Sequence, residues 1–409
     1  MTRICAHAGL ATEPRSIPSR DPQWQSPMGR FVLSDLRKVF GPAWLVMMAD
    51  VDAASIITAM QTGATFKYEF IIILLALIIP LYFICEVAGR VGSATKKGLG
   101  ELIRDNFSKK LSIALSFPMA ATDFLSYVAE YTAIAVGMSI IGIPPLISLP
   151  VVYVVHILVV FKQEYAAAEK YLLAASMVML VAYLAFMSKS VSGYPLVPQH
   201  MSKDFFFLIA ANVGAVIMPF MLFYQTTATA QKEYHSVVAT KVETFVGAVF
   251  SEIIMVAIVI VSAGLGSNIT INTTASLTSA INGLGGTYAP TLFSLGLVAA
   301  GFLALIVISM ASAWGIAEAL DLKGNTWLKI YVLESLPAVV IPLLFGNLIA
   351  LVLGLMVALV FVLIGPVVAM GLLAQNKRLM GEHALNKFDK VAFWGSVIAV
   401  ICCGLLAFV

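Results

Sequence analysis

The stretch Met48-Ala49-Asp50-Val51-Asp52-Ala53-Ala54-Ser55 places two carboxylates inside a run, 42–63, that is otherwise apolar enough to cross a membrane. A charged side chain at the centre of a bilayer costs at least ~2.5–3.5 kcal/mol, so such residues face the interior of a helix bundle or a water-filled cavity. The stretch therefore predicts a spanning helix that carries a polar site.

The composition of the whole chain indicates the same environment. Of its 409 residues, 60% are hydrophobic and 11% are charged. A soluble domain cannot bury so much apolar surface. No segments alternate as short strands do, so we expect an all-α polytopic membrane protein and not a barrel. No nucleotide-binding loop, nucleophile motif or cofactor signature is present, and we expect no enzymatic activity, no cofactor and no nucleic-acid partner.

Eleven apolar runs are long enough for the ~20 residues that a spanning helix needs. They lie at about 40–63, 69–89, 111–141, 144–161, 169–187, 205–229, 243–265, 288–319, 328–345, 347–373 and 391–409. Between the seventh and eighth runs, residues 266–287 are rich in Asn and Thr, which predicts a loop with short turns.

The basic residues fall mainly on one side of these spans. Twenty-two of the twenty-five Lys and Arg residues lie in the N-terminal arm or in the loops that follow even-numbered spans, which predicts a cytoplasmic N-terminus and an external Val409. Residues 1–38 are polar and lack an apolar signal region, so we expect a flexible cytoplasmic arm. The protein is then a multi-pass protein of a cell membrane, either a prokaryotic inner membrane or a plasma membrane.

Span six carries a helix-breaking signal at Pro219. A proline inside a helix removes the hydrogen bond to the carbonyl four residues earlier, which belongs to Ala215. A freed carbonyl at mid-membrane depth is tolerated only where it faces protein or a water-filled cavity. Pro219 therefore predicts an interrupted helix with an exposed backbone oxygen inside the bundle.

Span one carries the carboxylates but no such signal. On an ideal helix Asp50 and Asp52 point in nearly opposite directions, whereas Ser55 shares a face with Asp52. Ala53 and Ala54 favour continuous helix, so propensity alone predicts that only span six is interrupted.

Several stretches, in order along the chain, resemble motifs of the Nramp family of divalent-metal transporters. They are Gly41-Pro42-Ala43-Trp44, Ala49 to Ser55, Met60-Gln61-Thr62-Gly63-Ala64, Arg90-Val91-Gly92, Leu99-Gly100-Glu101, Gly214-Ala215-Val216-Ile217-Met218-Pro219, Leu295 to Gly301, and Arg378-Leu379-Met380-Gly381. The similarity runs from about residue 38 to the C-terminus.

The resemblance implies a fold of five-plus-five helices in an inverted repeat, with discontinuous helices 1 and 6, and one extra helix. The single transporter domain would cover 39–409, with repeat one at about 39–187, repeat two at about 204–345, and the extra helices reaching 409. An unwound first helix is thus implied by the resemblance and not by the local propensities.

The resemblance also implies a set of metal ligands. Asp52 matches the family's metal-binding aspartate, and Ser55 occupies the position of its asparagine. The Ala215 carbonyl and the Met218 thioether match the ligands of the sixth helix. Four further residues are candidates for lining a vestibule or supporting these ligands, namely Asp50, Gln225, Thr226 and Glu130.

Departures from the family pattern concern its proton-handling positions. Phe220 and Gln225 stand where the sixth helix of the family has histidines, and Tyr127 replaces the acidic partner of the residue that Glu130 matches. Ala53 and Ala54 replace the proline and glycine of the first-helix motif. In these differences the chain resembles the distant prokaryotic branch of Nramp-related magnesium transporters.

The resulting hypothesis is a secondary transporter that imports Mg²⁺ and Mn²⁺ by alternating access without proton coupling. Oxygen ligands and a roomy site suit partly hydrated Mg²⁺, whereas the Met218 thioether favours a transition metal such as Mn²⁺. The partners are then the transported ion and the bilayer, and a monomer suffices. Two alternatives remain: a proton-coupled Mn²⁺/Fe²⁺ importer, and a sodium-coupled symporter of an organic solute on the same fold.

Overall fold

The computed structural model describes residues 41–162, 194–232, 237–264, 271, 273–285, 287–321 and 326–409. Within these ranges every regular element is a helix and there is no strand. The predicted arm 1–38 and the predicted span 169–187 lie outside them. Helices cover each of the other predicted spans.

The helices differ widely in length, from single turns to 32 residues. In chain order they are α2 (Pro42–Ala49), α3 (Ala53–Phe66), α4 (Ile71–Thr95), α5 (Leu99–Asn106), α6 (Lys109–Ile140), α7 (Pro145–Lys162), α9 (Lys203–Val216), α10 (Pro219–Ala230), α11 (Val237–Ala263), α12 (Thr274–Gly285), α13 (Ala289–Leu320), α14 (Thr326–Leu344), α15 (Leu348–Val362), α16 (Ile364–Gln375), α17 (Lys377–Met380), η3 (Gly381–His383), α18 (Lys387–Leu405) and η4 (Leu406–Phe408).

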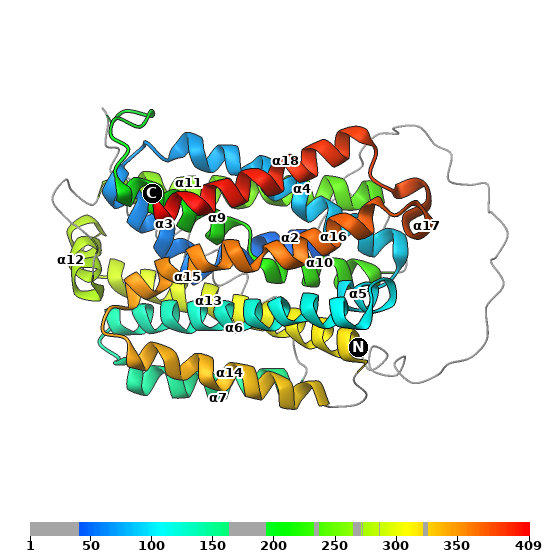
Figure 1. Ribbon diagram of the computed structural model, residues 1–409. Helices are drawn as coiled ribbons and strands as arrows, with labels where there is room; N and C mark the ends of the chain where they lie inside the picture. Colours follow the sequence, from blue (N-terminus) through cyan, green and yellow to red (C-terminus); the bar gives the residue numbers. More distant parts are fainter. Residues whose placement is uncertain are drawn as a thin grey trace, which may run out of the picture.

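The long helices run lengthwise through one bundle (Figure 1). Among the described residues, six helices are long and apolar enough to cross a membrane, and the bent pair α2–α3 makes a seventh when it is counted as one span. The short helices α5 and α17 lie at one end of the bundle, and α12 lies with the C-terminus at the other (Figure 1). The chain is a polytopic, all-helical membrane protein over the part that the structure describes.

The prediction of a loop at 266–287 is wrong for Thr274–Gly285, because these residues form α12. The Asn/Thr-rich sequence begins this helix where a chain of turns was expected. The Thr273 hydroxyl oxygen accepts the backbone N–H of Ser276 at 3.2 Å, which satisfies a free donor of the first turn.

Two glycines let helices around the interrupted spans approach each other closely. A Cβ atom on Gly214 of α9 would overlap the backbone carbonyl oxygen of Met356 on α15. A Cβ atom on Gly63 of α3 would overlap the carbonyl oxygen of Val259 on α11. These contacts fix α9 and α3 against neighbouring backbones, so they also fix the helix ends that carry the polar residues.

We expect Gly214→Ala to lower the thermal stability of the detergent-solubilised protein. The added methyl meets rigid backbone at Met356, and overpacking of this kind costs about 1–3 kcal/mol. Gly354→Ala on α15 is the control, because a Cβ atom at this position would have no neighbour within 4 Å and alanine favours helix. Equal melting temperatures for the two variants would contradict the close contact.

Candidate functional site

Span one is interrupted at the two carboxylates. Helix α2 ends at Ala49, α3 begins at Ala53, and the two segments meet at an angle of 52°. Asp52 is extended and lies at the N-cap of α3, where its Oδ1 accepts the backbone N–H of Ser55 at 2.7 Å. The prediction from propensity, a continuous helix here, is wrong because an aspartate N-cap starts a new helix in front of Ala53.

Span six is interrupted next to its proline. Helix α9 ends at Val216 and α10 begins at Pro219, with Met218 extended at the N-cap. Proline is well suited to the first position of a helix, because its missing N–H would have had no partner there. The chain therefore leaves helical geometry just before Pro219, where the sequence predicts the break.

The two interruptions lie against each other. The Ser55 hydroxyl on α3 donates a hydrogen bond of 2.9 Å to the Ala215 carbonyl oxygen on α9. Asp52 and Ser55 have no exposed surface, and Ala215 and Met218 are 1% exposed. The structure thus brings Asp52, Ser55 and the Ala215 carbonyl together in the protein interior, and the oxygen that Pro219 frees receives a donor from the other broken span.

Glu130 approaches the same break from α6. Its Oε2 accepts the backbone N–H of Ala53 at 3.3 Å, and its carboxyl group interacts electrostatically with that of Asp52. Asp52 Oδ2 and Glu130 Oε1 are buried and have no hydrogen-bond partner among the described residues. The two acidic groups lie together beside the break, close enough to share a hydrogen bond when one of them is protonated.

Asp50 lies at the other edge of the interruption, at the C-cap of α2. It is 3% exposed, and its Oδ1 has no hydrogen-bond partner in the described part of the chain. An ideal helix would point Asp50 and Asp52 apart, but in the broken span the two carboxyl groups lie close enough to interact electrostatically. The interruption thus gathers acidic side chains.

Gln225 and Thr226 lie on α10, beyond Pro219. The Gln225 amide donates to the Thr244 hydroxyl at 2.9 Å, and the Thr226 hydroxyl donates to the Leu222 carbonyl at 2.7 Å. The Thr226 hydroxyl also lies 3.2 Å from the Ala88 carbonyl on α4, whereas Gln225 Oε1 has no partner among the described residues. Neither side chain forms a hydrogen bond with Asp52 in the described part of the chain.

One group of acidic residues elsewhere in the bundle is neutralised by an arginine. Arg90 on α4 pairs with Glu86 at 2.8 Å and with Asp389 on α18 at 2.6 Å. No ion pair among the described residues includes Asp50, Asp52 or Glu130. The charges beside the interrupted helices therefore lack a permanent cationic partner in this part of the chain.

Side chains alone do not complete a metal-binding cage. Within the described ranges, no three His, Cys, Asp or Glu side chains are grouped closely enough to hold a metal ion. A cation at the break would take one or two carboxylates and complete its coordination with carbonyl, hydroxyl, thioether or water ligands. Binding through one or two carboxylates with several retained waters is the usual mode for Mg²⁺.

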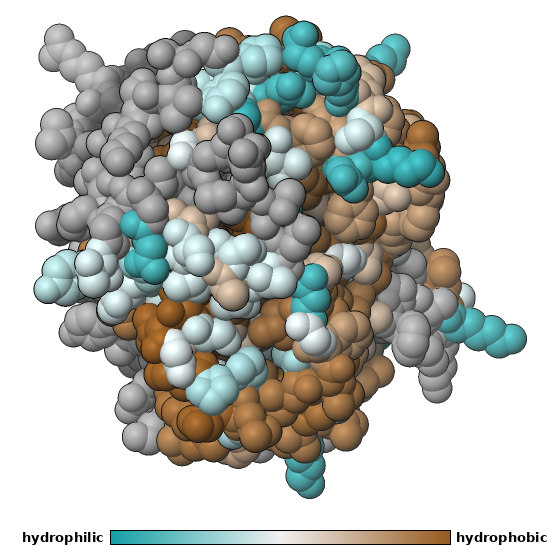
Figure 2. Space-filling model, turned by 90° about the vertical axis from the view of Figure 1, so that its left-hand side faces the viewer, coloured by the Kyte–Doolittle hydropathy of each residue, from teal (hydrophilic) through white to brown (hydrophobic). Residues whose placement is uncertain are grey.

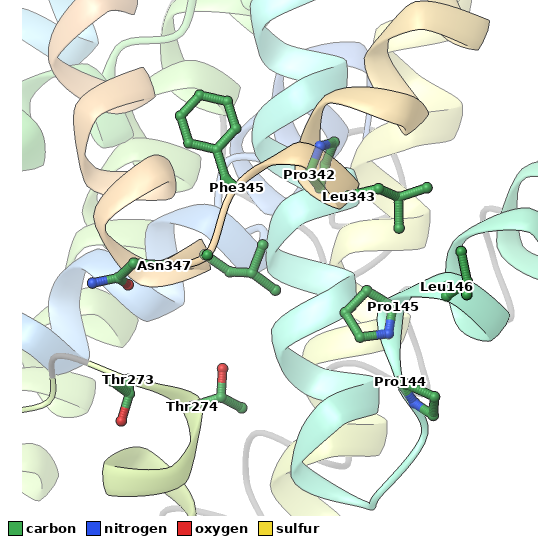
Figure 3. A pocket seen from close by; sticks show the side chains of 11 residues that line it. Pro144, Pro145, Leu146, Thr273, Thr274, Pro342, Leu343, Phe345 and Asn347 are labelled. Atoms are coloured by element: carbon green, nitrogen blue, oxygen red, sulfur yellow. The ribbon is translucent and has the colours of Figure 1, made fainter.

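A cavity opens at the α12 end of the bundle, away from these residues. It has a volume of about 420 Å³ and lies between Pro144–Leu146, Thr273–Thr274 and Pro342–Leu348 (Figure 3). The end-on view shows pale, weakly polar residues across this face and strongly hydrophobic residues below them (Figure 2). No residue of the interrupted helices lines the cavity, so it does not reach the break in this conformation.

Comparison with known proteins places this arrangement in a family. The model of the Nramp family, described as "natural resistance-associated macrophage protein-like", matches residues 43–409. The chain belongs to the Nramp family. This match covers both interrupted helices.

Individual Nramp relatives have low sequence identity to this chain, but the alignments cover most of both proteins. The divalent metal cation transporter MntH of Yersinia enterocolitica is 24% identical over 390 residues, covering 90% of this chain and 94% of the relative. MntH of Verminephrobacter eiseniae is also 24% identical, over 391 residues, covering 90% of this chain and 87% of the relative.

Solved structures show the same fold. The manganese transporter of Eremococcus coleocola, in complex with an aromatic bis-isothiourea compound, aligns with a TM-score of 0.74 and 19% identity over 93% of this chain and 88% of that chain. MhsT in complex with L-phenylalanine aligns with a TM-score of 0.61 and 14% identity over 90% of this chain and 98% of that chain. The fold is thus shared between this Nramp protein and a protein crystallised with an amino acid.

Two features of this Nramp site are absent from the sequence predictions. One is the N-cap made by Asp52, for which the spacing to Ser55 is a local signal. The other is the bond from the Ala53 N–H to Glu130, which joins residues 77 positions apart and has no local signal.

We expect Asp52→Asn to be more stable than Asp52→Ala by about 0.5–2 kcal/mol, because asparagine retains the N-cap acceptor and alanine does not. Both changes remove the same charge, so the comparison isolates the cap. Chemical unfolding of both variants in one detergent, with chelator present, measures the difference. Equal stabilities would show that the Asp52 side chain does not hold the start of α3.

Proposed function

We propose that this protein transports Mg²⁺ and Mn²⁺ across a cell membrane by alternating access, with Asp52, Ser55, the Ala215 carbonyl and Met218 as the ion ligands. The observation that carries the proposal is the Ser55–Ala215 hydrogen bond, which joins the two interrupted helices beside the buried Asp52 carboxyl group. Membership of the Nramp family and the MntH relatives support divalent metal ions as substrate.

The chemistry of these groups favours small divalent ions. A carboxylate, a hydroxyl and a backbone carbonyl are hard oxygen ligands of the kind that Mg²⁺ and Mn²⁺ prefer, and Ser55 leaves room for retained water. The Met218 thioether at the N-cap of α10 adds a soft ligand that favours Mn²⁺ over Mg²⁺. When an ion binds, the Ser55 hydroxyl proton turns away from the Ala215 oxygen, which frees both oxygens for the metal.

The transport is uncoupled from protons in this proposal. Phe220, Tyr127 and Gln225 stand where the family resemblance implies proton-handling side chains. A divalent ion that enters a cell gains ~4.6 kcal/mol per 100 mV of inside-negative potential, twice the value for one charge. The membrane potential therefore suffices to drive uptake.

The proposed topology has a cytoplasmic N-terminus, eleven spans and an external Val409. Support comes from Figure 1, where α5 and α17 lie at the end opposite α12 and the C-terminus. The segments around α5 and α17 carry many of the basic residues, as expected of a cytoplasmic face. The inverted repeat, with repeat one at about 39–187 and repeat two at about 204–345, then relates the two broken helices, and 1–38 forms a flexible arm.

A proton-coupled Mn²⁺/Fe²⁺ importer is the second candidate. It is favoured by Glu130, whose carboxyl group lies beside Asp52 and retains an unpartnered oxygen. Such a carboxyl is suitably placed to exchange a proton with the ion site. The two candidates differ in whether protons move with the metal.

We expect Asp52→Asn to abolish uptake of Mg²⁺ and Mn²⁺ into proteoliposomes, because it removes the ligand charge while keeping the N-cap. Uptake of Mg²⁺, Mn²⁺ and Ca²⁺ is measured side by side for the variant and for wild type. Glu382→Gln is the control for loss of a carboxylate, since its side chain is 91% exposed. Wild-type rates in Asp52→Asn would move the ion site elsewhere.

We expect wild-type uptake of Mg²⁺ and Mn²⁺ to leave the luminal pH unchanged. A pH-sensitive dye enclosed in the same vesicles reports any accompanying proton flux while an imposed inside-negative potential drives the metal. Acidification that rises with metal entry, and that Glu130→Gln removes, would establish the proton-coupled candidate.

A further inference from the structure

The connector between the last two apolar spans, residues 376–386, lies at one surface of the membrane. The spans that it joins are Leu348–Gln375 and Lys387–Phe408, so a connector this short stays close to the bilayer. Its helix α17 lies at the end of the bundle opposite α12 (Figure 1). In the span that follows, 28% of the apolar stretch is buried in the protein, so most of its surface faces lipid. The connector therefore borders on lipid headgroups.

The connector has a defined structure. The backbone N–H of Leu385 donates to the Ala374 carbonyl at 3.1 Å and closes the connector against the end of α16. The side chains of Met380 and Leu385 are buried. Asn386 Oδ1 accepts the backbone N–H of Asp389 at 2.9 Å and so caps α18. The side chains on this segment are therefore carried by an ordered backbone.

The connector and the first turn of α18 carry an excess of positive charge. The basic residues here, which we call the connector surface, are Lys377, Arg378, Lys387 and Lys390. Lys390 is partly exposed and the other three are exposed. None of the four forms an ion pair with a described residue. Of the two acidic residues between 376 and 390, Asp389 pairs with Arg90 and only Glu382 is exposed.

The ion pair with Arg90 restrains the connector surface. Asp389 lies between Lys387 and Lys390 in the sequence, and its carboxylate lies 2.6 Å from the Arg90 guanidinium on α4. The same guanidinium lies 2.8 Å from Glu86. Because Asp389 is fixed to α4, the two lysines beside it start from a restrained backbone, and a ligand that binds them pays less conformational entropy.

Apolar side chains lie next to these cations. Phe388 and Val391 of α18 are 70% and 74% exposed, and they alternate in the sequence with Lys387 and Lys390. Leu372, near the end of α16, is 50% exposed. Exposed apolar groups beside long basic side chains are typical of a membrane interface, where the apolar groups enter the acyl region and the charges reach the phosphates.

We propose that the connector surface binds the headgroups of anionic phospholipids. An anionic headgroup brings a net negative charge to these cations, whereas a zwitterionic headgroup also brings a positive one. In the proposed topology this end of the bundle is cytoplasmic, and the cytoplasmic leaflet is the one that carries a negative surface potential. The inference goes beyond the proposed function, since it requires neither a metal ion nor transport.

Native mass spectrometry of the purified full-length protein in a non-ionic detergent counts the lipids that bind. We expect wild type to bind phosphatidylglycerol more tightly than phosphatidylcholine with the same acyl chains. Lys387→Gln/Lys390→Gln should weaken phosphatidylglycerol binding by roughly tenfold, because each cation near an anionic headgroup adds to the affinity, and should leave phosphatidylcholine binding unchanged. Lys387→Arg/Lys390→Arg, which keeps both charges, should bind as wild type does.

Lys110→Gln/Lys329→Gln is the matched control. These exposed lysines lie near the starts of α6 and α14, and their removal takes the same charge from the same end of the bundle. This variant should bind phosphatidylglycerol as wild type does. An equal loss in this variant would overturn the inference, because binding would then follow the total charge of that end and not the connector surface.

Three other results would also overturn the inference. They are equal binding of the two lipids by wild type, wild-type affinity for phosphatidylglycerol in Lys387→Gln/Lys390→Gln, and displacement of the lipid by an equal concentration of sn-glycerol 3-phosphate. The last result would show that the surface binds a free phosphate. Asp52→Asn should bind phosphatidylglycerol as wild type does, so a failure of the proposed ion site is distinguishable from a failure of the connector surface.

Discussion

The Ser55 hydroxyl and the Ala215 carbonyl meet where two helices stop and restart inside an apolar bundle. In a bilayer no water is available to pair with free backbone groups, so an interrupted helix is stable only if protein groups replace the lost hydrogen bonds. Here the first interruption supplies a donor to the carbonyl that Pro219 frees in the second, and the Asp52 side chain accepts a backbone N–H at the start of α3. The position of every polar group beside the break depends on this mutual arrangement.

Close helix packing keeps the interruptions at that position. Gly63 and Gly214 allow the backbones of α3 and α9 to lie directly against the backbones of α11 and α15. Glu130 reaches the first residue of α3 from α6 and so connects the break to a third long helix. Three neighbouring helices therefore restrict the same few residues.

The sequence alone predicts much of this fold but only part of the site. Apolar runs of spanning length predict the long helices, because the bilayer imposes one simple requirement on each, and Pro219 predicts an interruption because proline acts locally. Helix propensity does not predict the break at Asp52, because Ala53 and Ala54 favour helix. The N-cap that starts α3 there depends on the single side chain of Asp52. The approach of Glu130 to Ala53 could not be predicted, because the two residues are 77 positions apart and meet only through the packing of α6 against α3.

The distribution of positive charge supports the proposal that the break binds ions reversibly. At α4 the carboxylates have Arg90, a fixed partner that holds α18 in place and cannot leave. Beside the break, no Lys, Arg or His of the described chain forms an ion pair with Asp52, Glu130 or Asp50. Neighbouring carboxylates repel each other strongly at low dielectric unless a proton or a cation neutralises them, and a permanent cation would block the site. In the proposed function a diffusible divalent ion neutralises them only while it is bound. The free energy of the buried acidic groups would then change with occupancy, which is what alternating access requires of the substrate.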